Sequence, residues 1–270
     1  IGERQVLVCS TGVIGMQLPI DRMADGAQKL AGLLEGGNEA GHRAAEAIMT
    51  TDTRPKEAAV QTVIGGKTVT VGGMCKGSGM IHPDMCTMLA FVTTDAAIDT
   101  ALLQEALSRD VEDTFNMVSV DGDTSTNDTL LVLANGCAGN PPIREKNEDY
   151  RAFAAALHEV CTVLAKKIAE DGEGATALFE AKVVGADTKE HARTLAKSVI
   201  TSSLTKAAIF GHDANWGRIL CALGYAGVDF DPEKIELYLE SEAGRILIYR
   251  DGKAADYSEE EAAKILSCPE

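Results

Sequence analysis

Three polar segments of this 270-residue sequence combine residue types that could do chemistry. In the first, a loop of residues 75–86 with two glycines, a lysine and a proline runs into the apolar stretch 88–92, and Thr87 stands at the junction. A threonine hydroxyl becomes a useful nucleophile only with a base beside it. A threonine that opens a strand is usually structural, so the spacing alone leaves both interpretations open.

The other two segments offer groups that could assist a nucleophile. Residues 9–15 run from an apolar stretch into a glycine-bearing turn. Backbone N–H groups that point outward from such a turn could form an oxyanion hole. Residues 170–176 place Glu173 between two glycines directly after a long helical pattern, which favours a projecting carboxylate. Each also has a structural interpretation, as a strand end and as a solvated carboxylate.

Two segments resemble known ligand-binding motifs, but each lacks residues that its motif requires. Residues 66–68 end like a phosphate-binding loop, but Gln61 occupies the position of its first glycine. Residues 121–128 have oxygen ligands at calcium-like spacing, but Thr126 and Val132 stand where glycine and glutamate are required. We therefore interpret 121–128 as a tight polar turn. The five histidines and seven cysteines show no ligand spacing, so no metal site is predicted.

Composition narrows the class of protein. With 25 Lys and Arg against 41 Asp and Glu, the formal net charge is −16, which argues against nucleic-acid and anionic-membrane partners. The odd number of cysteines, seven, favours reduced thiols and a cytoplasmic location. Because the sequence starts at Ile1, an organelle-targeted parent protein remains an alternative.

Helical and strand patterns alternate along the whole chain and predict a layered α/β or α+β sandwich with a second, smaller α/β lobe. Apolar spacing predicts helices over residues 20–34, 39–49, 99–108, 148–170, 189–204 and 215–223. Strands are predicted at 6–9, 62–64, 68–71, 88–92, 130–134, 182–184, 235–239 and 246–249, with a hairpin at 65–67. The Gly-, Pro- and Asn-rich stretch 135–149 suggests a boundary between domains 1–134 and 135–270.

Taken together, these segments resemble the ornithine acetyltransferases, the bifunctional glutamate N-acetyltransferases of arginine biosynthesis. The resemblance covers nearly the whole chain in seven ordered motifs. They lie at residues 10–15, 49–53, 76–81, 85–89, 120–129, 171–176 and 215–219. It implies an N-terminal-nucleophile-like fold, of the type shared with self-processing aminopeptidases.

The resemblance implies roles at matching positions. The bond between Cys86 and Thr87 would be cut by the chain itself, so that an α chain ends at 86 and a β chain begins at 87. Thr87 would be the nucleophile that accepts the acetyl group. The remaining matches are an oxyanion hole at Thr11 and Gly12, and substrate ligands at Thr50 or Thr51, Lys76, Thr87 and Glu173. Of the two adjacent threonines, Thr50 is preferred.

The chemistry explains why cleavage and catalysis are linked in such a family. Once Thr87 is the first residue, its own α-amine, with a pKa of about 7.7–8.0, can take the hydroxyl proton. By resemblance, acetyl passes from N-acetylornithine to glutamate in a ping-pong cycle, with acetyl-CoA as a second donor in bifunctional members. No metal or organic cofactor is expected, and the expected assembly is an α2β2 heterotetramer of the two cleavage products.

Two departures from the family pattern affect these expectations. Cys86 stands where alanine is usual, and we expect its thiol to alter the rate of self-cleavage or to compete as a nucleophile. Segments that precede the first motif and follow the last in the family are absent from this sequence, so an incomplete site is expected. The alternatives are an N-terminal-threonine amidohydrolase or aminopeptidase, which would discharge the acyl-enzyme to water, and a non-catalytic relative.

Overall fold

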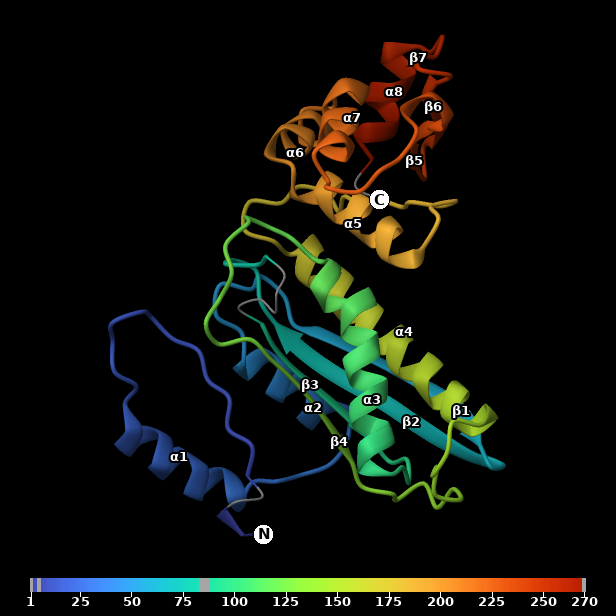
Figure 1. The fold of residues 1–270 in the computed structure, drawn as a ribbon. Coiled ribbons are helices and arrows are strands. Elements are labelled where there is room, and N and C mark those ends of the chain that lie inside the picture. Colours follow the sequence, from blue (N-terminus) through green and yellow to red (C-terminus); the bar gives the residue numbers. More distant parts are fainter. Residues whose placement is uncertain (1, 4–5, 83–87, 269–270) are drawn as a thin grey trace.

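The computed structural model describes residues 2–3, 6–82 and 88–268 (Figure 1). The first part of the chain contains α1 (Ile20–Ala31), α2 (Asn38–Ala47), β1 (Lys56–Ile64), β2 (Lys67–Lys76), β3 (Leu89–Thr94), α3 (Thr100–Asp110), β4 (Thr129–Ala134) and α4 (Glu148–Glu170). The second part contains α5 (Lys189–Thr201), α6 (Ser203–Phe210), α7 (Trp216–Gly224), β5 (Leu237–Ser241), β6 (Gly244–Arg250), β7 (Lys253–Ala254) and α8 (Glu259–Leu266). Among the helices of the described ranges, none has the length and apolar character that crossing a membrane requires.

A four-stranded sheet in the order β1-β2-β3-β4 forms the centre of the first lobe. The predicted hairpin is confirmed: β1 and β2 pair antiparallel around Gly65 and Gly66, whose φ angles of 55° and 74° suit a two-residue turn. This register sets Lys56, at the start of β1, opposite Cys75, at the end of β2. The hairpin thereby brings the two ends that carry Lys56 and Lys76 together.

The remaining pairings bring further chain ends to the same edge of the sheet. β2 pairs antiparallel with β3, with Lys76 opposite Leu89, and β3 pairs parallel with β4, with Leu89 opposite Thr129. The end of β2 and the starts of β3 and β4 therefore lie side by side. Residues just outside these strands, such as Met88 and Asp128, are held close to Lys76 by the sheet itself.

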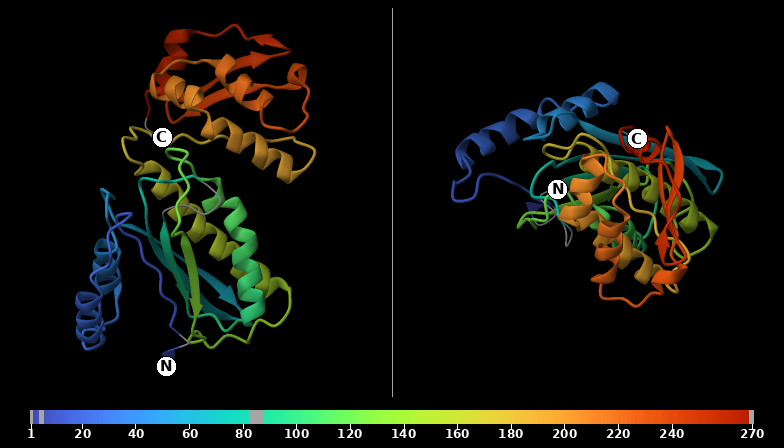
Figure 2. Two further views of the ribbon diagram at one scale, coloured as in Figure 1. Left: turned by 60° about the vertical axis from the view of Figure 1, so that its left-hand side comes forward. Right: turned by 90° about the horizontal axis from the view of Figure 1, so that it is seen from above.

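Helices cover both faces of this sheet. α4 packs against β1 and β2, and α3 packs beside α4, while α2 contacts β1 and β2 from the other side (Figure 2). The Asn147 side chain caps α4 by accepting a hydrogen bond from Tyr150 N–H at 3.1 Å. The apolar stripe of α4 is buried as its spacing predicts: Tyr150, Phe153, Ala156, Leu157, Val160, Cys161, Leu164, Ala165 and Ile168.

The second lobe has its own cores. A three-stranded sheet, β5-β6-β7, packs with α8 and α7, and its buried residues include Leu239, Ile248 and Ile265. The first core continues past the predicted domain boundary after residue 134, because α4 belongs to it up to Ile168. Residues that belong to the second lobe's cores begin at Phe179.

Three element predictions were wrong in detail. Residues 6–9 and 182–184 form no strand, because neither apolar run has a neighbouring strand to pair with in the described ranges. The single helix predicted over 189–204 is two helices, because Ser202 ends α5 and caps α6 by accepting a hydrogen bond from Thr205 N–H at 3.2 Å.

Candidate active site

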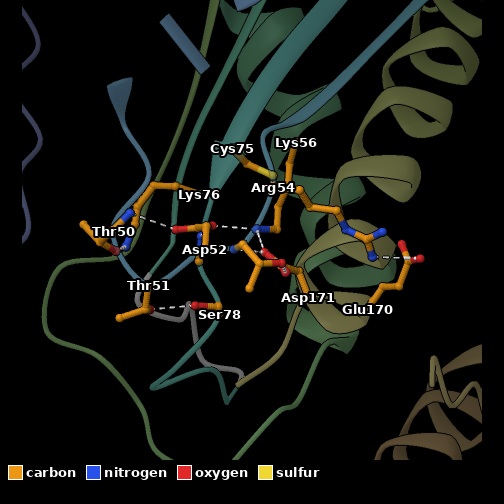
Figure 3. A network of polar contacts seen from close by, with 12 residues as sticks. Thr50, Thr51, Asp52, Arg54, Lys56, Cys75, Lys76, Ser78, Glu170 and Asp171 are labelled. Atoms are coloured by element: carbon orange, nitrogen blue, oxygen red, sulfur yellow. Dashed lines mark hydrogen bonds and ion pairs between the residues drawn. The ribbon is translucent and has the colours of Figure 1, made fainter. Parts of the chain in front are cut away.

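Three segments from distant parts of the sequence meet at the edge of the sheet where β2 ends (Figure 3). They are the loop 50–53 before β1, residues 76–79 at the end of β2, and residues 171–173 directly after α4. These are three of the segments that the sequence motifs mark, and hydrogen bonds join each of them to another.

Lys56 lies at the centre of this junction with a completely buried side chain. Its Nζ donates to Asp52 Oδ1 at 2.6 Å and to Asp171 Oδ2 at 2.5 Å. The two carboxylates come from residues 119 positions apart, on the first and third segments. A buried charge is tolerated only when it is paired and hydrogen-bonded, so this triad fixes the two segments relative to β1.

The two carboxylates extend the network into the backbone. Asp52 Oδ1 accepts from Gly77 N–H at 2.7 Å and Oδ2 from Thr50 N–H at 3.1 Å, while Asp171 Oδ2 accepts from Thr53 N–H at 3.0 Å. Burial by itself raises the pKa of both carboxyls. The hydrogen bonds, including those from Lys56, outweigh burial and lower both pKa values below the usual range.

Lys76 is the second buried lysine of the site, with 3% of its surface exposed. Its Nζ donates to Thr50 Oγ1 at 3.0 Å, and within the described part of the chain it makes no ion pair. Burial lowers the pKa of Lys76, partly countered by the charge of Asp52. A buried ammonium with a hydroxyl as its hydrogen-bond partner is well suited to bind a carboxylate that arrives with a substrate.

Glu173 is held beside the same loop by its backbone, because its N–H donates to Ser78 C=O at 2.8 Å. The Glu173 carboxylate lies against Gly79, where a Cβ would stand only 2.5 Å from Glu173 Cδ. Thr51 joins this side of the site through a 2.6 Å hydrogen bond between its hydroxyl and Ser78 Oγ. Glu173, Thr51 and Thr53 border a cleft of about 740 Å³ that opens to solvent.

The two adjacent threonines therefore face different partners. Thr50 contacts Lys76, and Thr51 contacts Ser78 on the side of Glu173. Lys76 and Glu173, 97 positions apart, are brought to the same loop of residues 76–79 with opposite charges.

The predicted oxyanion-hole pair lies in the N-terminal segment, outside any helix or strand. Thr11 is half-buried and Gly12 is exposed. Their neighbour Ser10 accepts a hydrogen bond through its carbonyl from Asn127 Nδ2 at 3.1 Å. Cys86 and Thr87, the predicted cleavage site and nucleophile, lie outside the described residues.

The loop of residues 121–128 makes hydrogen bonds to the loop of residues 77–82, to Met88 and to Ser10. The Asp121 carboxylate accepts from Met80 N–H at 2.6 Å, Ile81 N–H at 3.0 Å and Asp123 N–H at 3.0 Å, so it holds the loop of residues 77–82 as well as its own turn. Asp128 accepts from Met88 N–H at 3.1 Å. Among the described residues, no group of His, Cys, Asp and Glu is arranged to hold a metal ion.

Sequence reasoning assigned no role to Asp52, Lys56, Asp171 or Ser78. Asp52 and Asp171 lie inside the recognised motifs, so their motifs were the available signal. No local pattern distinguishes Lys56, which begins β1 directly beside another charged residue, Glu57. Its pairing with Asp171 depends on the packing of α4, which no local pattern contains.

Comparison with known proteins places the chain among relatives of one kind. The profile of the ArgJ family matches residues 1–270. The "Arginine biosynthesis bifunctional protein ArgJ" of Symbiobacterium thermophilum is 56% identical over 259 residues, which cover 96% of this chain and 63% of the relative. The protein of the same name from Thermotoga neapolitana is 49% identical over 267 residues, 99% of this chain and 66% of the relative.

A solved structure resembles the fold as well. The crystal structure of the arginine biosynthesis bifunctional protein argJ from Bacillus halodurans has a TM-score of 0.62 and 46% identity, over 66% of this chain and 81% of that one. The predicted mixed α/β fold class is confirmed by this match. The chain spans slightly less than two thirds of the length of these two curated relatives. On its sequence motifs, its site and these comparisons, the chain belongs to the ArgJ family.

Proposed function

We propose that the protein carrying this chain transfers an acetyl group from N-acetylornithine to glutamate through an acetyl-Thr87 intermediate, after cutting itself between Cys86 and Thr87. The observation that carries the proposal is the meeting of Lys76 and Glu173 at one loop. A buried ammonium with no carboxylate partner among the described residues and an exposed carboxylate can bind the two ends of an amino acid. The family membership and the names of the relatives support the pathway.

Each substrate offers matching charges. Lys76, with Thr50 beside it, binds the α-carboxylate of N-acetylornithine or of glutamate. Glu173 binds the side-chain ammonium of N-acetylornithine. This division assigns Thr50 to the carboxylate end and Thr51, hydrogen-bonded to Ser78, to the side of Glu173.

The reaction then runs in two balanced steps. The Thr87 oxygen attacks the acetyl carbon while its proton passes to the Thr87 α-amine, and the C–N bond of N-acetylornithine breaks as that proton moves to the departing ornithine nitrogen. In the second step the amine of glutamate attacks the acetyl-threonine ester, and Thr87 recovers its proton. Thr11 and Gly12 stabilise the oxyanion in both steps; losing one such donor usually costs about 100- to 1,000-fold in rate.

The same proposal covers partners and location. We propose that no metal or organic cofactor takes part, that acetyl-CoA serves as a second acetyl donor, and that the two cleavage products assemble as an α2β2 heterotetramer in the cytoplasm. The relatives are named bifunctional, which agrees with a second activity. The acidic composition argues against nucleic acid and anionic membranes as partners.

Intact mass and N-terminal sequencing of the full-length protein test the first half of the proposal. A β chain that begins at Thr87 is expected, and a Thr87→Ala variant should stay whole, whereas the neighbouring Thr93→Ala variant should be cut normally. The second half is tested by incubating cut protein with N-acetylornithine, with and without glutamate. Without glutamate, the transferase should release no more than about one ornithine per active site, and continued release should require glutamate; continued release without glutamate identifies the hydrolase alternative. An uncut, folded and inert wild type would indicate a non-catalytic relative.

A further inference from the structure

The two substrates of the proposed reaction bring opposite charges to the same end of the site. N-acetylornithine and glutamate share an α-carboxylate, which we assign to Lys76. The side chain of the first ends in an ammonium, however, and that of the second ends in a carboxylate. The Glu173 carboxylate attracts the ammonium and repels the carboxylate. A site that takes both amino acids in turn therefore needs a cation close to Glu173.

Glu173 borders a second cavity besides the substrate cleft. This interlobe cavity, of about 610 Å³, lies between α4 of the first lobe and α5 and α6 of the second (Figure 1). Its volume falls within the range of about 300–1,000 Å³ that is usual for small-molecule sites. The cleft and the interlobe cavity share one wall, which consists of Glu173, Gly174, Ala175, Ala177 and Leu178.

Most of the cations along these two spaces already have carboxylate partners. Of the six lysines and arginines that border the cleft or the interlobe cavity, four form ion pairs: Arg54, Lys166, Lys189 and Arg193. The other two, Lys182 and Lys206, form no ion pair with any described residue. Lys182 is exposed, whereas Lys206, on α6, is half-buried. Lys206 is therefore a partly desolvated cation without a carboxylate in the described part of the chain.

The Lys206 ammonium lies close to the turn that carries Glu173. Its Nζ donates to Ser119 C=O at 2.7 Å and to Val120 C=O at 2.8 Å. An ammonium has three N–H donors, so one remains for a ligand. The Val120 side chain packs against Gly172, where a Cβ would stand 3.0 Å from Val120 Cγ1. Because Glu173 directly follows Gly172, these contacts bring Lys206 and Glu173 to the same part of the site.

The surroundings of Lys206 favour an anion that arrives with a ligand. Burial lowers the pKa of Lys206, partly countered by the charge of Asp121. A cation that has lost part of its hydration and has only carbonyl partners is poorly compensated. A carboxylate at the third N–H would form a charge-assisted hydrogen bond and restore the balance of charge.

We propose that Lys206 is a specificity-determining residue for the acetyl acceptor, with its ammonium binding the side-chain carboxylate of glutamate. This inference rests on the proposed function. The site then offers two positions for the end of a side chain, Glu173 for the ammonium of N-acetylornithine and Lys206 for the carboxylate of glutamate. Lys76 binds the α-carboxylate in both cases. Each substrate of the cycle thereby meets a side chain of opposite charge at both of its ends.

The test is Lys206→Met in the full-length protein, assayed with glutamate and with glutamine as acceptor. Glutamine has the same length without the charge, so the ratio of the two kcat/KM values reports on the contact with the carboxylate. This ratio should fall by about 10- to 100-fold in the variant, the usual value of a hydrogen bond to a charged group. Lys206→Gln keeps N–H donors for the two carbonyls and should lower the ratio as well, which covers a methionine variant that fails to fold. Lys182→Met, on the wall of the same cavity, is the matched control and should keep the wild-type ratio.

The outcomes separate this inference from a structural role and from failure of the proposed function. A ratio that falls in the Lys206 variants and stays unchanged in Lys182→Met supports the inference. An equal loss with both acceptors would show that Lys206 only supports the fold, and it overturns the inference, as does an unchanged ratio. The proposed function is checked separately by the ornithine that wild type releases from N-acetylornithine before glutamate is added. A wild type that releases none overturns the proposed function and this inference with it.

Discussion

The buried triad of Lys56, Asp52 and Asp171 leads to a quantitative prediction. Lys56→Met keeps most of the length of the side chain and removes its charge, which leaves two buried carboxylates without their ammonium partner. Removing one partner of a buried ion pair typically costs about 3–5 kcal/mol in the free energy of unfolding, and here a single ammonium serves two carboxylates. We therefore expect a loss at or above the upper end of that range at neutral pH.

The pH dependence of this loss is equally specific. The pKa values of Asp52 and Asp171 are lowered in the fold, so the stability they contribute is present above their unfolded pKa of 3.8 and is lost as the pH falls through the lower folded values. In the methionine variant both carboxyls can become neutral by taking up protons. The difference between wild type and variant should therefore shrink as the pH falls below about 4.

Urea unfolding of the full-length protein, followed by circular dichroism at several pH values, measures both effects. Lys67→Met is the matched control, because Lys67 is exposed on the same hairpin and should change stability by less than about 0.5 kcal/mol. A loss of less than about 1 kcal/mol for Lys56→Met would place it in the range of surface ion pairs and refute the buried-pair reasoning. A loss that is independent of pH would show that packing, rather than charge, holds the three segments together.

Three further predictions concern the substrate ligands. Lys76→Met should raise KM for glutamate by about 10- to 100-fold, the usual value of a hydrogen bond to a charged group, in steady-state assays. Gly79→Ala should raise KM for N-acetylornithine while leaving self-cleavage intact, because the new Cβ would stand 2.5 Å from Glu173 Cδ and displace that carboxylate. Thr50→Val should weaken the binding of both substrates measured by calorimetry, because Thr50 contacts Lys76, whereas Thr51→Val should mainly affect N-acetylornithine.

Each of these has a contradicting outcome. Equal KM values for glutamate in wild type and Lys76→Met would remove Lys76 from the carboxylate site. An unaltered KM for N-acetylornithine in Gly79→Ala would separate Glu173 from the ornithine ammonium. A variant of Thr51 that weakens glutamate more than a variant of Thr50 does would reverse the assignment of the two threonines.

The sequence was sufficient for elements whose apolar pattern is long or whose turn chemistry is local. The stripe of α4, the hairpin at Gly65 and Gly66, and the Asn215 cap of α7 all follow from spacing and residue type. The strand predicted at 6–9 failed because strand formation depends on a partner that local spacing does not specify. Residues 182–184 failed for the same reason.

The site shows the same division between local and distant information. Lys76, Glu173 and the two threonines could be named from motifs, and the structure brings all four to the end of β2. Lys56 could not, since its partner Asp171 is 115 positions away and reaches it only through the packing of α4 on β1. Hydrogen bonds between segments so far apart depend on tertiary packing, which leaves no periodic trace in the sequence.

The antiparallel pairing of β2 with β3 has a consequence for the molecularity of folding. The proposed cut falls in the connection between these two strands, so the central sheet would consist of two strands from each product, joined by the β2–β3 hydrogen bonds from Val71–Thr94 to Lys76–Leu89. Before the cut, the sheet assembles within one chain at a rate independent of protein concentration. Afterwards, the same sheet can re-form from the denatured state only by association of two chains, so refolding becomes second order. Self-cleavage would thereby turn a unimolecular folding reaction into one whose rate depends on the concentrations of both products.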